Sequence, residues 1–126
     1  MKKAAGILGF TAALTMAMPL AMADGNADAG EKVFKKCKAC HIIDKEKNRL
    51  GPHLIGIVGR TSVSIEGFKY SKAMKEPAIT WDETTLDQYL ADPKGFVPKN
   101  KMAFAGLKKE EDRANVIAYL KQATGG

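Results

Sequence analysis

The residues best suited to chemistry lie together in Cys37-Lys38-Ala39-Cys40-His41. This is C-x-x-C-H, the sequence at which a c-type haem is attached. On a helix, side chains three and four positions apart share a face, so both thiols and the imidazole would point the same way. The thiols could then add to the two vinyl groups on one porphyrin edge, and the imidazole could bind the iron. The motif therefore predicts a covalently bound haem.

Two other sites could use these cysteines, a redox dithiol and half of a zinc site. A thioredoxin-like dithiol follows a strand in a β-α-β pattern, and no strand is predicted before Cys37. A zinc site needs a second pair of ligands, but the chain has one further histidine, His53, and no further cysteine. Both alternatives are weaker than haem attachment.

An iron bound by His41 needs its sixth ligand from a more distant part of the chain. The candidates are His53, Met74 and Met102. His53 follows His41 closely, which favours a loop on the same side of the ring. Met102 lies much further along, in the polar loop 98–102, where a core-filling role is less expected for a methionine. Met102 is therefore favoured, with His53 and Met74 as the alternatives.

The N-terminus has the pattern of an export signal. Lys2 and Lys3 precede an uncharged, apolar run from Ala4 to Leu20, and Ala21-Met22-Ala23 is a small-x-small cleavage site. The alternative is a transmembrane anchor, because residues 4–23 could nearly span a bilayer. We expect a cleavable signal peptide over 1–23 and a mature domain over 24–126. Export would place that domain in the periplasm, an oxidising compartment.

The composition indicates one globular domain. The chain has 126 residues, of which 45% are hydrophobic and 27% charged, and its formal net charge is +6. Two cysteines exclude a scaffold with several disulfides and any four-cysteine metal site. The excess of basic residues favours acidic partners.

The periodicity predicts a mainly helical chain. Asp28 and Glu31 form a capping box at the start of a first helix, which would continue through Cys37. A second helix begins after Asp82 and must stop near Asp92, because Pro93 follows. A third runs from about residue 109 to the C-terminus, and a short one is possible around 71–75. No segment alternates at period two, so no sheet is expected.

Several further stretches accompany the haem motif, in order along the chain. They are Gly51-Pro52 to Gly59-Arg60, Gly67-Phe68-Lys69-Tyr70, Ile79-Thr80-Trp81, Tyr89-Leu90-Ala91-Asp92-Pro93-Lys94, Lys101-Met102-Ala103-Phe104-Ala105-Gly106 and Ile117-Ala118-Tyr119-Leu120-Lys121. With this ordered set the chain resembles class I cytochrome c, similar to bacterial cytochrome c2 and mitochondrial cytochrome c. The resemblance implies a small all-α fold in which the N- and C-terminal helices cross, with loops and short helices around one covalently bound haem c.

The resemblance also implies a role for each matching residue. Cys37 and Cys40 would form the thioethers, and His41 and Met102 would be the axial iron ligands. Pro52 would accept a hydrogen bond from the His41 ring, and Tyr89 would lie beside the Met102 sulfur. The propionates would be held by Arg60, Tyr70 and Trp81, while Gly30 and Phe34 would pack against Val116 and Tyr119. Two positions depart from the family pattern. Met74 stands where an Asn is frequent and Asn100 where a Thr is common, so the potential and the loop stability cannot be carried over.

The implied activity is one-electron transfer by a soluble, monomeric carrier rather than enzymatic turnover. The implied partners are membrane redox complexes: a cytochrome bc1-type quinol:cytochrome c reductase, and an oxidase or a photosynthetic reaction centre. A haem enzyme or gas sensor would need an open iron position, and no obvious acid–base histidine accompanies Met102.

The distribution of charge agrees with such docking. Segments 32–41 and 93–109 contain lysines and no acidic residue. A cluster of one sign steers partners of the opposite charge. The lysines expected to face a partner are Lys32, Lys36, Lys94, Lys101, Lys108 and Lys109. Nucleic acid is not an expected partner, since no recognition motif is present.

Overall fold

The computed structural model describes residues 4–6, 9–13 and 25–126, and within them the chain is mostly helical with one small sheet. The elements are α1 (Ala27–Phe34), β1 (Arg60–Thr61), α2 (Lys72–Lys75), β2 (Thr80–Trp81), α3 (Glu83–Ala91), α4 (Pro93–Phe96) and α5 (Glu110–Thr124). The expected helices are all present. The cleavage site expected at 21–23 lies outside the described residues. No helix in the described ranges is long and apolar enough to cross a membrane.

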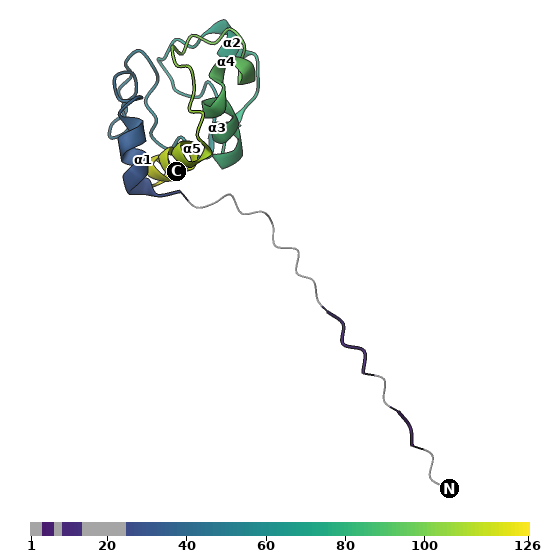
Figure 1. Cartoon of the computed structure of the whole chain (residues 1–126). Helices are drawn as coiled ribbons and strands as arrows, with labels where there is room; N and C mark the ends of the chain where they lie inside the picture. Colours follow the sequence, from purple (N-terminus) through teal and green to yellow (C-terminus); the bar gives the residue numbers. More distant parts are fainter. Residues whose placement is uncertain (1–3, 7–8, 14–24) are drawn as a thin grey trace.

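The terminal helices α1 and α5 cross, as the resemblance implies (Figure 1). Their contact is the most extensive between any two elements of the described chain. A Cβ at Gly30 would overlap the backbone oxygen of Asn115, so only glycine permits this approach. The ring of Phe34 lies 5.5 Å from that of Tyr119, centroid to centroid. The crossing therefore fixes the start of the segment that follows α1, which contains the C-x-x-C-H motif.

The start of α1 differs from the prediction. The N-cap is Asn26, whose side chain accepts a hydrogen bond from the backbone N–H of Ala29 at 3.0 Å. The predicted capping box of Asp28 and Glu31 is therefore wrong, because the helix begins two residues earlier. Asp28 lies in the first turn, where its charge suits the helix dipole. The backbone N–H of Asn26 donates to Oδ1 of Asn115, which ties this cap to α5.

Helix α3 begins and ends where the sequence predicts. Asp82 is its N-cap and exchanges hydrogen bonds with Thr85 in a capping box. At Asp92 the backbone leaves the helical conformation, with φ −153° and ψ 85°, and α4 begins at the next residue, Pro93, a position that suits proline. Asp92 caps α4 by accepting from the N–H of Gly95 at 3.0 Å.

The expectation that no sheet forms is wrong. Strands β1 and β2 form an antiparallel pair in which Arg60 lies opposite Trp81 and Thr61 opposite Thr80. Strands of two residues are too short to leave an alternating pattern in the sequence. The pair matters for the site because it brings Arg60 next to the buried Trp81.

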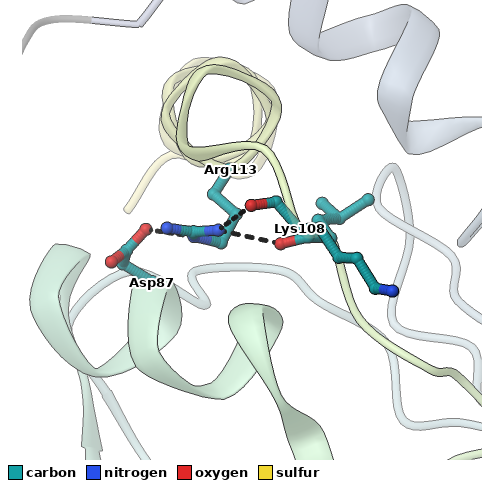
Figure 2. A network of polar contacts seen from close by, with 4 residues as sticks. Asp87, Lys108 and Arg113 are labelled. Atoms are coloured by element: carbon teal, nitrogen blue, oxygen red, sulfur yellow. Dashed lines mark hydrogen bonds and ion pairs between the residues drawn. The ribbon is translucent and has the colours of Figure 1, made fainter.

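The guanidinium of Arg113, on α5, joins α3 to the segment that precedes α5 (Figure 2). Its Nε donates to Oδ1 of Asp87 at 2.7 Å, and Nη1 donates to the backbone oxygens of Leu107 at 2.9 Å and Lys108 at 3.1 Å. The Arg113 and Asp87 side chains are only 13% and 25% exposed, so water screens this pair less than a surface ion pair. The network anchors the C-terminal end of the segment that carries Met102.

Candidate haem site

The two cysteines and the histidine of the C-x-x-C-H motif lie on turns that continue from α1. The helix ends at Phe34, but hydrogen bonds of helical spacing continue from Cys37 N–H to the Phe34 oxygen at 2.8 Å and from His41 N–H to the Cys37 oxygen at 3.0 Å. Cys37 and Cys40 are half-buried free thiols. Burial raises the pKa of Cys37, so this thiol is protonated at neutral pH. The motif thus keeps the helical spacing on which the haem prediction depends, beyond the end of the helix itself.

The imidazole of His41 is held from one side by the chain segment that follows. Its Nδ1 donates to the backbone oxygen of Pro52 at 2.7 Å. A Cβ at Gly51 would overlap the ring, so glycine allows the backbone to pass directly beside it. Burial lowers the pKa of His41 more than the Pro52 carbonyl raises it. The ring is therefore neutral at neutral pH, with Nδ1 as its donor and Nε2 as the nitrogen that can bind a metal.

Met102 lies beside the aromatic side chain of Tyr89, as the resemblance implies. The hydroxyl of Tyr89 is 3.6 Å from the Met102 sulfur. The Tyr89 ring is buried, with its centroid 5.0 Å from that of Trp81 and 6.2 Å from that of Phe96. Burial raises the pKa of Tyr89 to about 12, so at neutral pH its hydroxyl is protonated and can donate to the sulfur.

Arg60 projects into the fold with one donor unused. Its Nη1 donates to the backbone oxygens of His53 at 2.9 Å and Ile55 at 3.1 Å. Its Nε is the one buried side-chain nitrogen or oxygen of the described residues that has no hydrogen-bond partner. Burial lowers the pKa of Arg60, and the nearby Tyr70 acts in the opposite direction. A buried donor without a partner is costly, so this nitrogen is suited to a bound acceptor such as a carboxylate.

The three candidates for the sixth ligand have different surroundings in the structure. His53 directly follows Pro52, which holds His41, and its Nδ1 accepts from the Ile55 N–H at 3.3 Å. Met74 is half-buried on α2 and packs against the hydrophobic core. Of the two methionines, only Met102 has a hydrogen-bond donor directed at its sulfur, the hydroxyl of Tyr89.

The burial of Asn100 was not predicted from the sequence: this polar residue is only 3% exposed. Its neighbours Lys99 and Lys101 are exposed, so a polar, exposed loop was the natural expectation. No local sequence signal distinguishes a buried Asn in such a loop from an exposed one.

The residues of this site fit a haem better than any other group. Two free thiols, a neutral imidazole, a thioether and an unpartnered guanidinium nitrogen match its vinyl groups, its iron and its propionates. Met102 and Cys37 both pack at the edge of one hydrophobic core, which suits an apolar macrocycle. In the described part of the chain, no group of three or more His, Cys, Asp or Glu side chains could hold a metal ion.

A family model described as cytochrome c matches residues 27–124. The chain belongs to the cytochrome c family. It is 56% identical over 102 residues to cytochrome c of Chlamydomonas reinhardtii, covering 79% of this chain and 91% of that one. It is 54% identical over 88 residues to cytochrome c2 iso-2 of Magnetospirillum fulvum, covering 70% and 92% of the two chains. Among solved structures, cytochrome cH from Methylobacterium extorquens matches with a TM-score of 0.74 and 46% identity, over 78% of this chain and 99% of that one.

Membership of this family confirms the fold class, the cofactor and the general activity that the sequence predicts. This cytochrome c binds one haem c through two thioether bonds, and the chain contains only two cysteines. It is an electron carrier and not an enzyme.

The six lysines expected to meet a partner are all exposed. Within the described ranges, none of them forms an ion pair with a carboxylate. Lys94 differs from the others, because its ammonium donates to the backbone oxygen of Asn100. Five lysines are therefore available as simple surface charges, and Lys94 also contacts the segment that carries Met102.

Proposed function

We propose that this cytochrome c is an exported one-electron carrier between membrane redox complexes. It would accept electrons from a quinol:cytochrome c reductase of the bc1 type and pass them to an oxidase or a photosynthetic reaction centre. The observation that carries the proposal is that both candidate ligands are held by the protein: His41 by the Pro52 carbonyl, and Met102 beside the Tyr89 hydroxyl. A site with two fixed ligands leaves no open position for a substrate, which suits a carrier.

In this proposal His41 and Met102 are the axial ligands, and Cys37 and Cys40 form the thioethers. When bound, haem supplies reversible exchange of one electron between the ferric and ferrous states. The hydrogen bond to Pro52 holds the His41 ring in one tautomer and raises its basicity. Ligation by Met together with His gives a higher potential than ligation by two His.

The remaining residues of the site would shield and orient the cofactor. Arg60 offers its unpartnered Nε to a carboxylate, with Tyr70 close by. Trp81 and Tyr89 close the site with a pair of packed rings. An apolar surrounding of this kind would disfavour the ferric form with its extra positive charge, and the potential would rise.

Docking would use the lysines of segments 32–41 and 93–109, which flank the two proposed ligands. These are Lys32, Lys36, Lys94, Lys101, Lys108 and Lys109. Their uniform charge favours acidic faces on the partner complexes and raises the rate of encounter. The carrier would act as a monomer.

Residues 1–23 would direct export to the periplasm and be removed after Ala23. Mass spectrometry of the exported holoprotein tests this directly, since the chain should begin at Asp24. A mature chain that retains residues 1–23 would instead favour a membrane anchor.

The proposed route is tested with membrane vesicles that contain either a bc1-type reductase or a terminal oxidase. The purified holoprotein should be reduced by the first in the presence of quinol and reoxidised by the second, with both rates falling as salt is raised. Photosynthetic reaction centres replace the oxidase in a parallel reaction. The route is wrong if the holoprotein is not reduced by the reductase, or if neither acceptor reoxidises it.

A further inference from the structure

The side chain of Asn100 connects the backbone of Met102 to helix α4. Its Oδ1 accepts a hydrogen bond from the Met102 N–H at 2.9 Å. Its Nδ2 donates to the backbone oxygen of Pro93 at 2.7 Å and to that of Val97 at 2.9 Å. One amide thus joins the first residue of α4 and its C-cap to the residue proposed as axial ligand.

The orientation of this amide is fixed by its partners. Pro93 and Val97 offer carbonyl oxygens, which only accept, while the Met102 N–H only donates. The donor end of the amide must therefore face α4, and the acceptor end must face Met102. A buried amide that loses such bonds carries a desolvation penalty, so this side chain, at 3% exposure, strongly favours one arrangement of the loop.

The part of the fold to which Asn100 is joined is itself well fixed. Pro93 is fully buried, Val97 is 2% exposed, and Asp92 caps the helix. The neighbouring Phe96 packs against the ring of Tyr89, whose hydroxyl faces the Met102 sulfur. The Met102 sulfur therefore faces a hydroxyl from α3, and the Met102 N–H is joined to α4 through the Asn100 amide.

The chain immediately around Met102 adds one hydrogen bond, from the Phe104 N–H to the Met102 oxygen at 2.9 Å. Lys101 and Ala103 are exposed. Lys99 has a φ of 65°, a left-handed conformation that lysine seldom adopts, and this turn lets the Asn100 side chain point back to α4. Lys94 covers the outside, with its ammonium donating to the Asn100 backbone oxygen.

We propose that Asn100 is the positioning residue that fixes the Met102 backbone and so keeps the Met102 sulfur available as an axial ligand. This inference rests on the proposed assignment of Met102 as that ligand. Asn100 does not touch the cofactor in this role. Asn100 makes opening of the Met102 loop rarer, and so makes it rarer for another ligand to replace Met102.

Imidazole binding to the ferric holoprotein measures this opening, because imidazole can coordinate only when Met102 has left. Asn100→Leu nearly conserves the volume of the side chain and removes all its hydrogen bonds. The expected result is about tenfold tighter imidazole binding, which is the change in an equilibrium constant that one or two lost net hydrogen bonds produce. Asn100→Asp keeps the acceptor for the Met102 N–H but sets a carboxylate oxygen against the Pro93 and Val97 oxygens, so it should also bind imidazole more tightly than wild type.

Asn115→Leu is the matched control. Asn115 is also a buried asparagine, 8% exposed, and its Oδ1 accepts from the Asn26 N–H at the crossing of α1 and α5. This variant should lower the free energy of unfolding without changing imidazole affinity. If Asn100→Leu and Asn100→Asp tighten imidazole binding no more than Asn115→Leu does, Asn100 is an ordinary structural residue and the inference is wrong.

Met102→Ala separates the inference from the assignment beneath it. If Met102→Ala binds imidazole no more tightly than wild type, Met102 is not the ligand and the proposed site fails with the inference. If Met102→Ala binds imidazole much more tightly while the Asn100 variants bind it as wild type does, the assignment stands and only the role of Asn100 is overturned.

Discussion

The hydroxyl of Tyr89 lies 3.6 Å from the sulfur of Met102, although the whole of α4 separates the two residues in the sequence. Burial raises the pKa of Tyr89 to about 12, so the phenol remains protonated at neutral pH and acts as the donor. Packing against Trp81 and Phe96 fixes the ring that presents this hydroxyl. A donor directed at a thioether withdraws electron density from the sulfur, and this should tune how strongly the sulfur donates to a metal.

Tyr89→Phe tests that relationship. Without the hydroxyl the sulfur should donate more strongly and stabilise the ferric state, so the reduction potential should fall by roughly 30 to 60 mV, equivalent to a three- to tenfold change in the redox equilibrium. Stability should change little, since the lost hydrogen-bond acceptor is a weakly polar sulfur. Potentiometric titration measures the first effect and urea unfolding the second. Tyr119→Phe, in a ring that packs on Phe34, should leave the potential unchanged.

Met102→Ala tests the identity of the sixth ligand. The variant should lose the ferric absorbance that depends on thioether coordination, because water or a harder ligand would take the site. Its potential should fall by on the order of 100 mV, within the span of about 0.8 V over which axial ligands set haem potentials. Met74→Leu should keep both properties. The opposite pattern would assign the ligand to Met74, and no change in either variant would favour His53.

Local signals made much of this fold predictable, and long-range contacts account for the rest. Asp82 and Pro93 mark the limits of α3 because capping and the missing proline N–H act within a few residues. The β1–β2 pair depends on partners far apart in the sequence, such as Arg60 and Trp81, and leaves no local pattern. Asn100 is similar, since its amide finds its partners only once the loop has turned back onto α4.

The residues of the site also divide into those predictable from local spacing and those that depend on long-range contacts. Cys37, Cys40 and His41 were evident because their chemistry depends on a short spacing that helical turns preserve. The contact between His41 and Pro52 and the one between Tyr89 and Met102 came from the family resemblance, and the structure contains both. Spacing alone could not have supplied them, because each joins segments whose approach depends on the whole fold.

Replacing Cys37 and Cys40 together by Ala should release the haem to acidic solvent and leave the apoprotein largely unfolded. The described chain has eleven buried hydrophobic side chains, a small core for a domain that lacks the ring as filler. Loss of a tightly bound group also removes its contribution to stability. Acid–solvent extraction and far-UV circular dichroism measure the two outcomes. A double variant that purifies colourless and fully helical would show that the core does not depend on haem.

Asp82 should give α3 a stability that depends on pH. Hydrogen bonds from Thr85 hold the pKa of Asp82 below its ordinary value of about 3.9 in the folded state. Its contribution is therefore complete above that ordinary value and is lost as the pH falls through the folded pKa. Asp82→Asn keeps an uncharged cap, so wild type should exceed it in stability at neutral pH, and the difference should shrink between pH 5 and pH 3. Urea unfolding at each pH measures the difference, and a constant difference would contradict the assignment.

Substitution of exposed lysines tests whether docking is local. Lys36→Glu and Lys101→Glu should each slow the second-order rate with an acidic redox partner about two- to tenfold at low salt, a share of the roughly 10- to 1,000-fold acceleration that steering can give. The effect should fade as salt rises, because screening shortens to about 8 Å at physiological ionic strength. The free energy of unfolding should change by less than about 1 kcal/mol.

Lys45→Glu is the control for net charge, since Lys45 is exposed and lies outside both lysine segments. Lys121→Glu is less suitable, because Lys121 pairs with Glu83 at 2.8 Å and the variant would set two carboxylates against each other. Stopped-flow rates measured over a range of salt decide the matter: equal slowing by Lys45→Glu would mean that net charge, and no particular face of the molecule, governs the encounter.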